Sequence, residues 1–97
     1  MTDQVAILAD IRPGRRAELE RVLAQGPPFD LTKEGFEHHE VFLGDNEVVF
    51  VFTGPGAASE LQRLASGSEL AARMMRLSEV LAAPRLLQQT FRWERQR

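Results

Sequence analysis

The chain has 97 residues, a net charge of -2 and no cysteine, which sets limits on its size and chemistry. This length suits one domain, residues 1–97, around one hydrophobic core. Without cysteine the chain has no disulfides, thiolate metal ligands or cysteine nucleophile. Nucleic acids and anionic membranes select a clustered positive surface, so the slight negative charge argues against both partners.

The first residues, Met1-Thr2-Asp3-Gln4, have neither the basic segment nor the apolar stretch of a signal peptide. No run approaches the ~20 apolar residues that cross a bilayer. We therefore expect a cytoplasmic protein.

The first half of the chain begins with a strand and a helix. Residues 4–11 form a near-continuous apolar run, which is typical of a central strand buried on both faces. Arg12-Pro13-Gly14 ends the run and leads into a helix over residues 15–25, whose apolar positions recur at helical spacing. Gly26 is a natural stop for this helix.

A loop over residues 26–35 leads to two strand-like runs, 36–43 and 47–53, which predict a β-hairpin. If Asp45-Asn46 is a two-residue turn, one set of side chains points away from the helices: Phe36, His38, Glu40, Phe42, Val49, Val51 and Thr53. A three-residue Gly44-Asp45-Asn46 loop shifts the pairing by one and separates this set. We favour the first register, because the second places His38 and Glu40 against the core without obvious partners.

The second half predicts a short helix at about 57–65, a further helical segment at about 69–82 ended by Pro84, and a last strand over 86–94. The order β-α-β-β-α-β indicates an α+β, ferredoxin-like fold. Right-handed crossovers give a four-stranded antiparallel sheet in the order 4-1-3-2, with both helices on one face. The other face is then uncovered.

The chain resembles the dimeric α+β barrel superfamily over nearly its whole length. The resemblance rests on the element order, on Ile11-Arg12-Pro13-Gly14 before the first helix, and on the central strand Val48-Val49-Phe50-Val51-Phe52. It implies a sheet-to-sheet homodimer that encloses a cavity. The superfamily includes cofactor-free monooxygenases, small cyclases, sugar mutarotases, haem-handling enzymes and proteins without known activity.

The sequence lacks residues that are typical of several of these activities. Residues 15–25 contain neither the Tyr nor the His that such mutarotases carry on the first helix. Both histidines lie on a predicted strand, whereas haem-binding relatives use a helical histidine. The cofactor-free monooxygenases typically pair Asn and Trp in the cavity, and Asn46 here belongs to the hairpin turn. We expect no cofactor.

His38 and Glu40 are the candidate catalytic residues. They are two apart on one strand and point the same way, and a carboxylate can orient a neighbouring imidazole for acid/base work. The competing interpretation is that both are solvated residues of an edge strand. A metal site at His38 and His39 is not predicted, because consecutive strand residues project to opposite faces.

On the last strand, Leu87, Phe91 and Trp93 share one face, and we expect them in the core. Gln88, Thr90 and Arg92 share the other face, where Arg92 could pair with an anionic ligand. The candidate ligand-binding set for a small apolar or anionic molecule is Phe36, Phe42, Thr53, Gln88, Thr90 and Arg92.

Charge gives a separate reason to expect self-association. Most of the charged residues in 30–47 are acidic, and most of the charged residues in 85–97 are basic. The 4-1-3-2 order puts them on opposite edges of the sheet, too far apart to pair within one chain, so a two-fold dimer would match acidic with basic edges. Two hypotheses for function follow: a small-molecule-binding or cofactor-free enzyme domain, or a non-catalytic homodimeric module.

Overall fold

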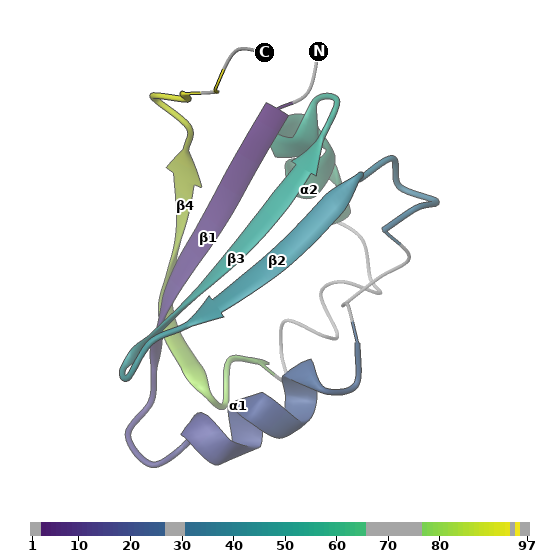
Figure 1. Cartoon of the computed structure of the whole chain (residues 1–97). Coiled ribbons are helices and arrows are strands. Elements are labelled where there is room, and N and C mark those ends of the chain that lie inside the picture. Colours follow the sequence, from purple (N-terminus) through teal and green to yellow (C-terminus); the bar gives the residue numbers. More distant parts are fainter. Residues whose placement is uncertain (1–2, 27–30, 66–76, 94, 96–97) are drawn as a thin grey trace.

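The computed structural model describes residues 3–26, 31–93 except 66–76, and residue 95 (Figure 1). The elements are β1 (Asp3–Ile11), α1 (Arg16–Leu23), β2 (His38–Leu43), β3 (Glu47–Gly54), α2 (Ala57–Ala65) and β4 (Leu81–Gln88). The four strands form one antiparallel sheet in the order β2-β3-β1-β4, which is the predicted 4-1-3-2 order. The ferredoxin-like α+β topology is therefore confirmed.

Both helices cover the same face of the sheet. Leu19 of α1 is fully buried and packs with Ala9 of β1 and Val48 of β3. Leu61 of α2 packs with Val5, at the other end of β1 on the same face. The strand β1 was expected to be buried on both faces, but its residues on the opposite face are only half-buried, because no helix in the described part of the chain covers them.

The hairpin has the favoured register. His39, Val41 and Leu43 of β2 lie opposite Phe52, Phe50 and Val48 of β3, respectively. The Gly44 N–H donates to the Glu47 carbonyl at 2.8 Å and closes the turn around Asp45 and Asn46. His38 and Glu40 therefore point away from the helices, as predicted.

The region before β4 differs from the expectation. The predicted helical segment at 69–82 lies largely outside the described residues, but its end is wrong, because Leu81 already begins β4. The register of β4 against β1 shifts between Leu8 and Asp10, at Ala83 and Pro84, and Ala83 has a positive φ of 50°. A bulge on an edge strand accepts proline, which has no N–H for the ladder. Pro84 thus lies within a strand and does not terminate a helix.

The last strand also ends earlier than expected. It was predicted over 86–94, but β4 ends at Gln88. Phe91 and Trp93, which were expected in the core, are 80% and 73% exposed. They cannot be core residues of this chain, because they lie beyond the last backbone pairing of the sheet.

Phe36 is a further correction. It was expected on the uncovered face, but it is 7% exposed and packs with Val5, Phe52 and Leu61 under α2. The reason is that β2 begins only at His38, so strand alternation does not extend back to Phe36.

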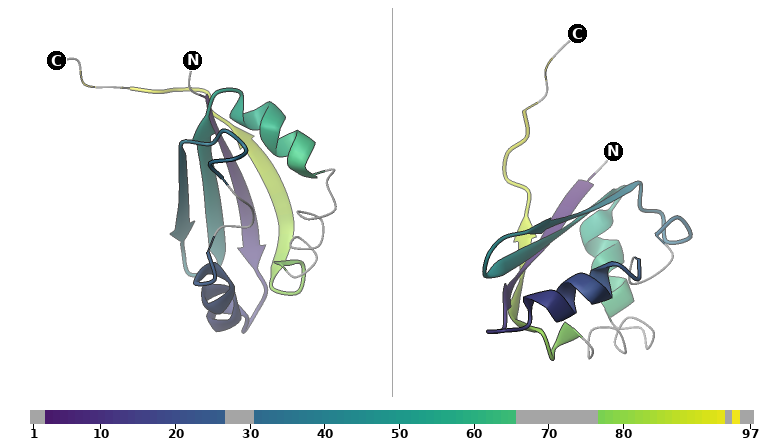
Figure 2. Two further views of the ribbon diagram at one scale, coloured as in Figure 1. Left: turned by 90° about the vertical axis from the view of Figure 1, so that its right-hand side faces the viewer. Right: turned by 60° about the horizontal axis from the view of Figure 1, so that its bottom comes forward.

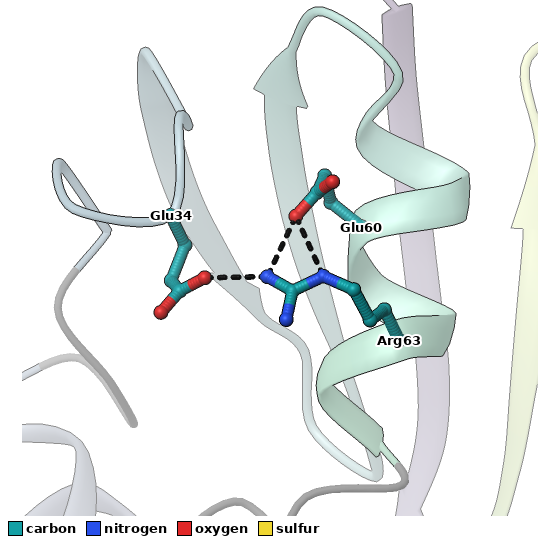
Figure 3. Close-up of polar contacts among 3 residues, drawn as sticks. All are labelled: Glu34, Glu60 and Arg63. Carbon is teal, nitrogen blue, oxygen red and sulfur yellow. Dashed lines mark hydrogen bonds and ion pairs between the residues drawn. The ribbon is translucent and has the colours of Figure 1, made fainter.

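A cluster of three charged side chains connects the loop before β2 to α2 (Figure 3). Arg63 of α2 contacts Glu34 at 2.6 Å and Glu60 at 2.9 Å. These carboxylates raise the pKa of Arg63 through hydrogen bonds and charge. Because all three side chains reach solvent, salt should weaken the cluster, and we assign it a minor part in holding the loop.

Candidate functional site

The candidate site is the face of the sheet that points away from both helices, which we call the open face. Its residues follow from the strand pairings: Gln4, Ala6, Leu8, Asp10, His38, Glu40, Phe42, Glu47, Val49, Val51, Thr53, Ala82, Arg85 and Leu87. Directly opposite residues form rows across the strands, so the face can be described row by row.

A polar row crosses one end of the open face. His38 of β2 lies opposite Thr53 of β3, and Thr53 lies opposite Gln4 of β1. The Gln4 side-chain amide donates to the Thr53 hydroxyl at 3.2 Å, and the Gln89 side-chain amide donates to Oε1 of Gln4 at 3.0 Å. Thr53 is only 9% exposed, so this end of the open face is hydrogen-bonded and partly shielded from water.

The middle of the open face is apolar. Val51 and Ala6 make up the centre of one row, and Val49 and Leu8 the centre of the next. Phe42 and Leu87 lie on the outer strands beside these rows, where they are 56% and 42% exposed. An apolar floor with a few polar groups at its margin is the usual character of a small-molecule site.

An ionic group closes the opposite end. Arg85 lies 3.2 Å from Asp10 and 4.0 Å from Glu47. We expected these acidic and basic segments to be too far apart to pair within one chain, and for Arg85 and Glu47 this was wrong. Both side chains point toward the intervening strand β1, where Asp10 lies between Glu47 and Ala82.

The structure brings together four of the predicted site residues, and separates the rest. His38, Glu40, Phe42 and Thr53 share the open face. No hydrogen bond joins His38 to Glu40 among the described residues, so any cooperation between them would require a ligand or water. Phe36 is in the core, and Thr90 and Arg92 lie beyond β4 and are exposed.

Gln88 was predicted on the open face but lies on the other one. It pairs with Val5, whose side chain is in the core beneath the helices, whereas Leu87 pairs with Ala6 of the open face. The bulge before Arg85 inserts one residue and reverses the alternation that the pattern of β4 would otherwise follow.

Two residues of the polar row, Gln4 and Gln89, were not predicted from the sequence. Gln4 is a polar residue at the start of a mostly apolar strand, and this was the signal in the sequence that marked this end of the open face. Gln89 had no comparable signal, because its position depends on the bulge.

His39 lies on the helix-covered face, where it packs against its neighbours instead of facing the candidate site. Its ring stacks on Phe52 with centroids 4.3 Å apart, and Nδ1 donates to the Val51 carbonyl at 3.0 Å. Burial lowers the pKa of His39, and the hydrogen bond to Val51 only partly offsets this effect. His39 is therefore a half-buried histidine whose Nδ1 has a hydrogen-bond partner.

Acidification is expected to destabilise the fold through His39. Its folded-state pKa lies below the ordinary value of 6.5, so the unfolded chain binds the proton more readily. Stability should be fully present above that value and should decrease as the pH falls below it. Urea unfolding at about pH 8 and about pH 5.5 should show this loss, reduced in His39→Gln. His38→Gln, on the opposite face, is the control and should keep it; an equal loss in wild type and His39→Gln would contradict the assignment.

The described residues have neither a metal-ligand cluster nor a membrane-spanning helix. No group of three or more His, Cys, Asp or Glu side chains in these segments is arranged to hold a metal ion. In the same part of the chain, no helix has the length and apolar character that crossing a membrane requires.

No protein-family model matches the chain, and no curated protein sequence matches it. Solved structures do match over nearly the whole length. An antibiotic biosynthesis monooxygenase superposes with a TM-score of 0.68 at 12% identity, covering 94% of this chain and 98% of that chain.

SnoaB, a cofactor-independent oxygenase from Streptomyces nogalater, gives a TM-score of 0.63 at 18% identity, covering 95% of this chain and 96% of its own. A protein of unknown function from Nitrosomonas europaea gives 0.68 at 18% identity, with coverages of 99% and 97%. At these identities the likeness is one of fold. The chain therefore shares the ferredoxin-like α+β fold of these structures, and the predicted resemblance is confirmed at the level of the fold alone.

Proposed function

We propose that the chain forms a homodimer through its open faces and that the space between the two sheets binds a small, largely apolar molecule. The observation that carries this proposal is the open face itself, with an apolar centre between a polar row and an ionic group. A sheet with one apolar face in water is unfavourable, and a second copy provides a complementary cover with two-fold symmetry.

Within this space we assign His38 the role of general base. It lies at the polar end of the open face beside the hydrogen-bonded row of Thr53 and Gln4. Proton abstraction from carbon or oxygen is the first step common to cofactor-free oxygenation, isomerisation and cyclisation, so one base could serve any of them. The likeness to SnoaB, a cofactor-independent oxygenase, supports the choice of this class.

The alternative is a homodimeric module without catalysis, in which Phe42, Val49 and Leu8 of the two copies fill the space completely. Both proposals require the open face to be the interface. They differ in whether the polar row contacts a ligand.

Replacing Phe42 by aspartate should weaken the dimer strongly. Burial of a phenylalanine side chain contributes at least about 1.5 kcal/mol, and the two-fold axis counts each change twice, so the dissociation constant should rise about 100-fold or more. Sedimentation velocity at micromolar concentration measures this change.

Leu86→Asp is the matched control. Leu86 is also a large exposed hydrophobic residue, at 43%, but it pairs with Ile7 and so points to the other face. The dimer should survive this substitution. A wild-type chain that sediments as a monomer, or a dimer that Leu86→Asp disrupts and Phe42→Asp does not, would contradict the proposed interface.

A further inference from the structure

The segment after β4 has an unusual surface, and we call residues 89–93 the arm. In Figure 2 the arm leaves the end of the sheet and extends away from the molecule, on the side opposite α2. It presents Phe91 and Trp93, which are 80% and 73% exposed. The two side chains are two residues apart, so on an extended backbone they point to the same side.

The large hydrophobic residues that are exposed in the described part of the chain are not scattered. Phe42 and Leu87 lie on the open face, and Phe91 and Trp93 lie on the arm, with Leu86 apart from both groups. Two apolar surfaces that the single chain leaves uncovered are thus located on the same side of the molecule, opposite α2.

We infer that the arm of each chain packs on the open face of a second copy, so that Phe91 and Trp93 form part of the partner's ligand-binding space. This inference rests on the proposed dimer and deepens it, because each site would then be incomplete without the other chain. The second copy is the occupant that the observations favour, since its open face is the apolar surface that a face-to-face dimer brings toward the arm.

The arm is long enough for this contact. Extended chain spans about 3.3 Å per residue, so the five residues from Gln89 to Trp93 reach about 16 Å, whereas packed sheets lie about 10 Å apart. The aromatic residues can therefore cross the gap and contact the partner's sheet without rearrangement of β4.

Charge is complementary along the same path. The arm includes Arg92, and Arg95 lies just beyond it. The edge strand β2 and the residue before it present the exposed acids Glu40 and Glu37. Alternation directs Arg92 to the side opposite Phe91 and Trp93, toward the rim of the interface. Basic residues at the rim are attracted to the acidic edge of the partner's sheet, whereas Arg85 of their own chain repels them.

Trp93 reports directly on this contact. It is the only tryptophan, and the chain has no tyrosine, so its fluorescence is free of other contributions. In the wild-type dimer we expect emission at shorter wavelength and several-fold weaker quenching by acrylamide than in the Phe42→Asp monomer. Trp93→Ala should also raise the dimer dissociation constant without changing urea unfolding of the monomer. Leu86→Ala should leave association unchanged, because Leu86 pairs with Ile7 and points away from the open face.

The outcomes separate the two proposals. A wild-type dimer whose Trp93 emits and quenches as an exposed side chain would overturn the arm contact and leave the open-face dimer intact. Shielded Trp93 in the Phe42→Asp monomer would also overturn it, because the cover would then come from the same chain. A wild-type monomer would defeat the dimer proposal, and the arm contact with it.

Discussion

Gly54→Ala is expected to destabilise the fold by roughly 2–3 kcal/mol, at the upper end of what overpacking costs. Gly54 ends β3 at the point where the loop crosses into β2. A Cβ atom there would lie 2.8 Å from the Gly35 carbonyl oxygen and 3.1 Å from the Phe36 Cα. Both neighbours are backbone atoms, so relief requires the loop to move and Phe36 to leave its place in the core. Urea unfolding with an unchanged slope measures the loss.

Gly44→Ala is the control for this prediction. Its added Cβ would meet only the Glu47 carbonyl oxygen at 3.4 Å, and Gly44, like Gly54, does not have a positive φ. The expected change is within about 0.5 kcal/mol. Equal effects of the two substitutions would show that the close approach of the loop at Gly54 has no energetic consequence.

The hairpin and the order of strands were predictable because local signals agreed with the packing. Asp45-Asn46 suits a two-residue turn, and only one register places Val41, Leu43, Val48 and Phe50 together beneath the helices. Period-two patterning then located His38, Glu40, Phe42 and Thr53 on the open face. The prediction for these residues depended only on the alternation of side chains along two strands and on the turn between them.

The misplaced residues depended on backbone irregularities that a hydrophobic pattern does not encode. Ala83, with its positive φ, and Pro84 form a bulge that exchanges the faces of all later residues of β4, so Gln88 and Leu87 traded places. Phe36 precedes its strand by two residues and turns into the core with the loop. Each error concerns a segment where alternation stops, rather than the assignment of the element itself.

The aromatic residues of the arm show a different limit. Phe91 and Trp93 have the composition of core residues, and the expectation of burial was reasonable for a single chain. In the structure they are exposed because β4 ends before them. In the proposed dimer these two side chains are buried by the second copy. A hydrophobic pattern does not show whether a residue is buried within its own chain or against another copy.

His38→Gln is expected to lower the rate of proton abstraction by about 100- to 10,000-fold, the range that a positioned general base contributes. Glutamine keeps a similar size and a hydrogen-bonding end but cannot accept a proton in this role. Because His38 is exposed, the free energy of unfolding should change by less than about 0.5 kcal/mol. Activity and stability therefore respond separately to this substitution.

Exchange of carbon-bound hydrogen with solvent deuterium, followed by NMR, is a readout that does not require the natural substrate. A panel of 1,3-diketones and hydroxyaryl ketones provides acidic C–H groups on small apolar frameworks that suit the open face. His39→Gln is the matched control, because His39 stacks on Phe52 on the opposite face and should not contact a ligand in this space. Exchange that His38→Gln leaves unchanged would remove His38 as the base. Full loss in His38→Gln with none in His39→Gln would favour the enzyme over the non-catalytic module, since a face that serves only to join two chains has no reason to accelerate proton transfer.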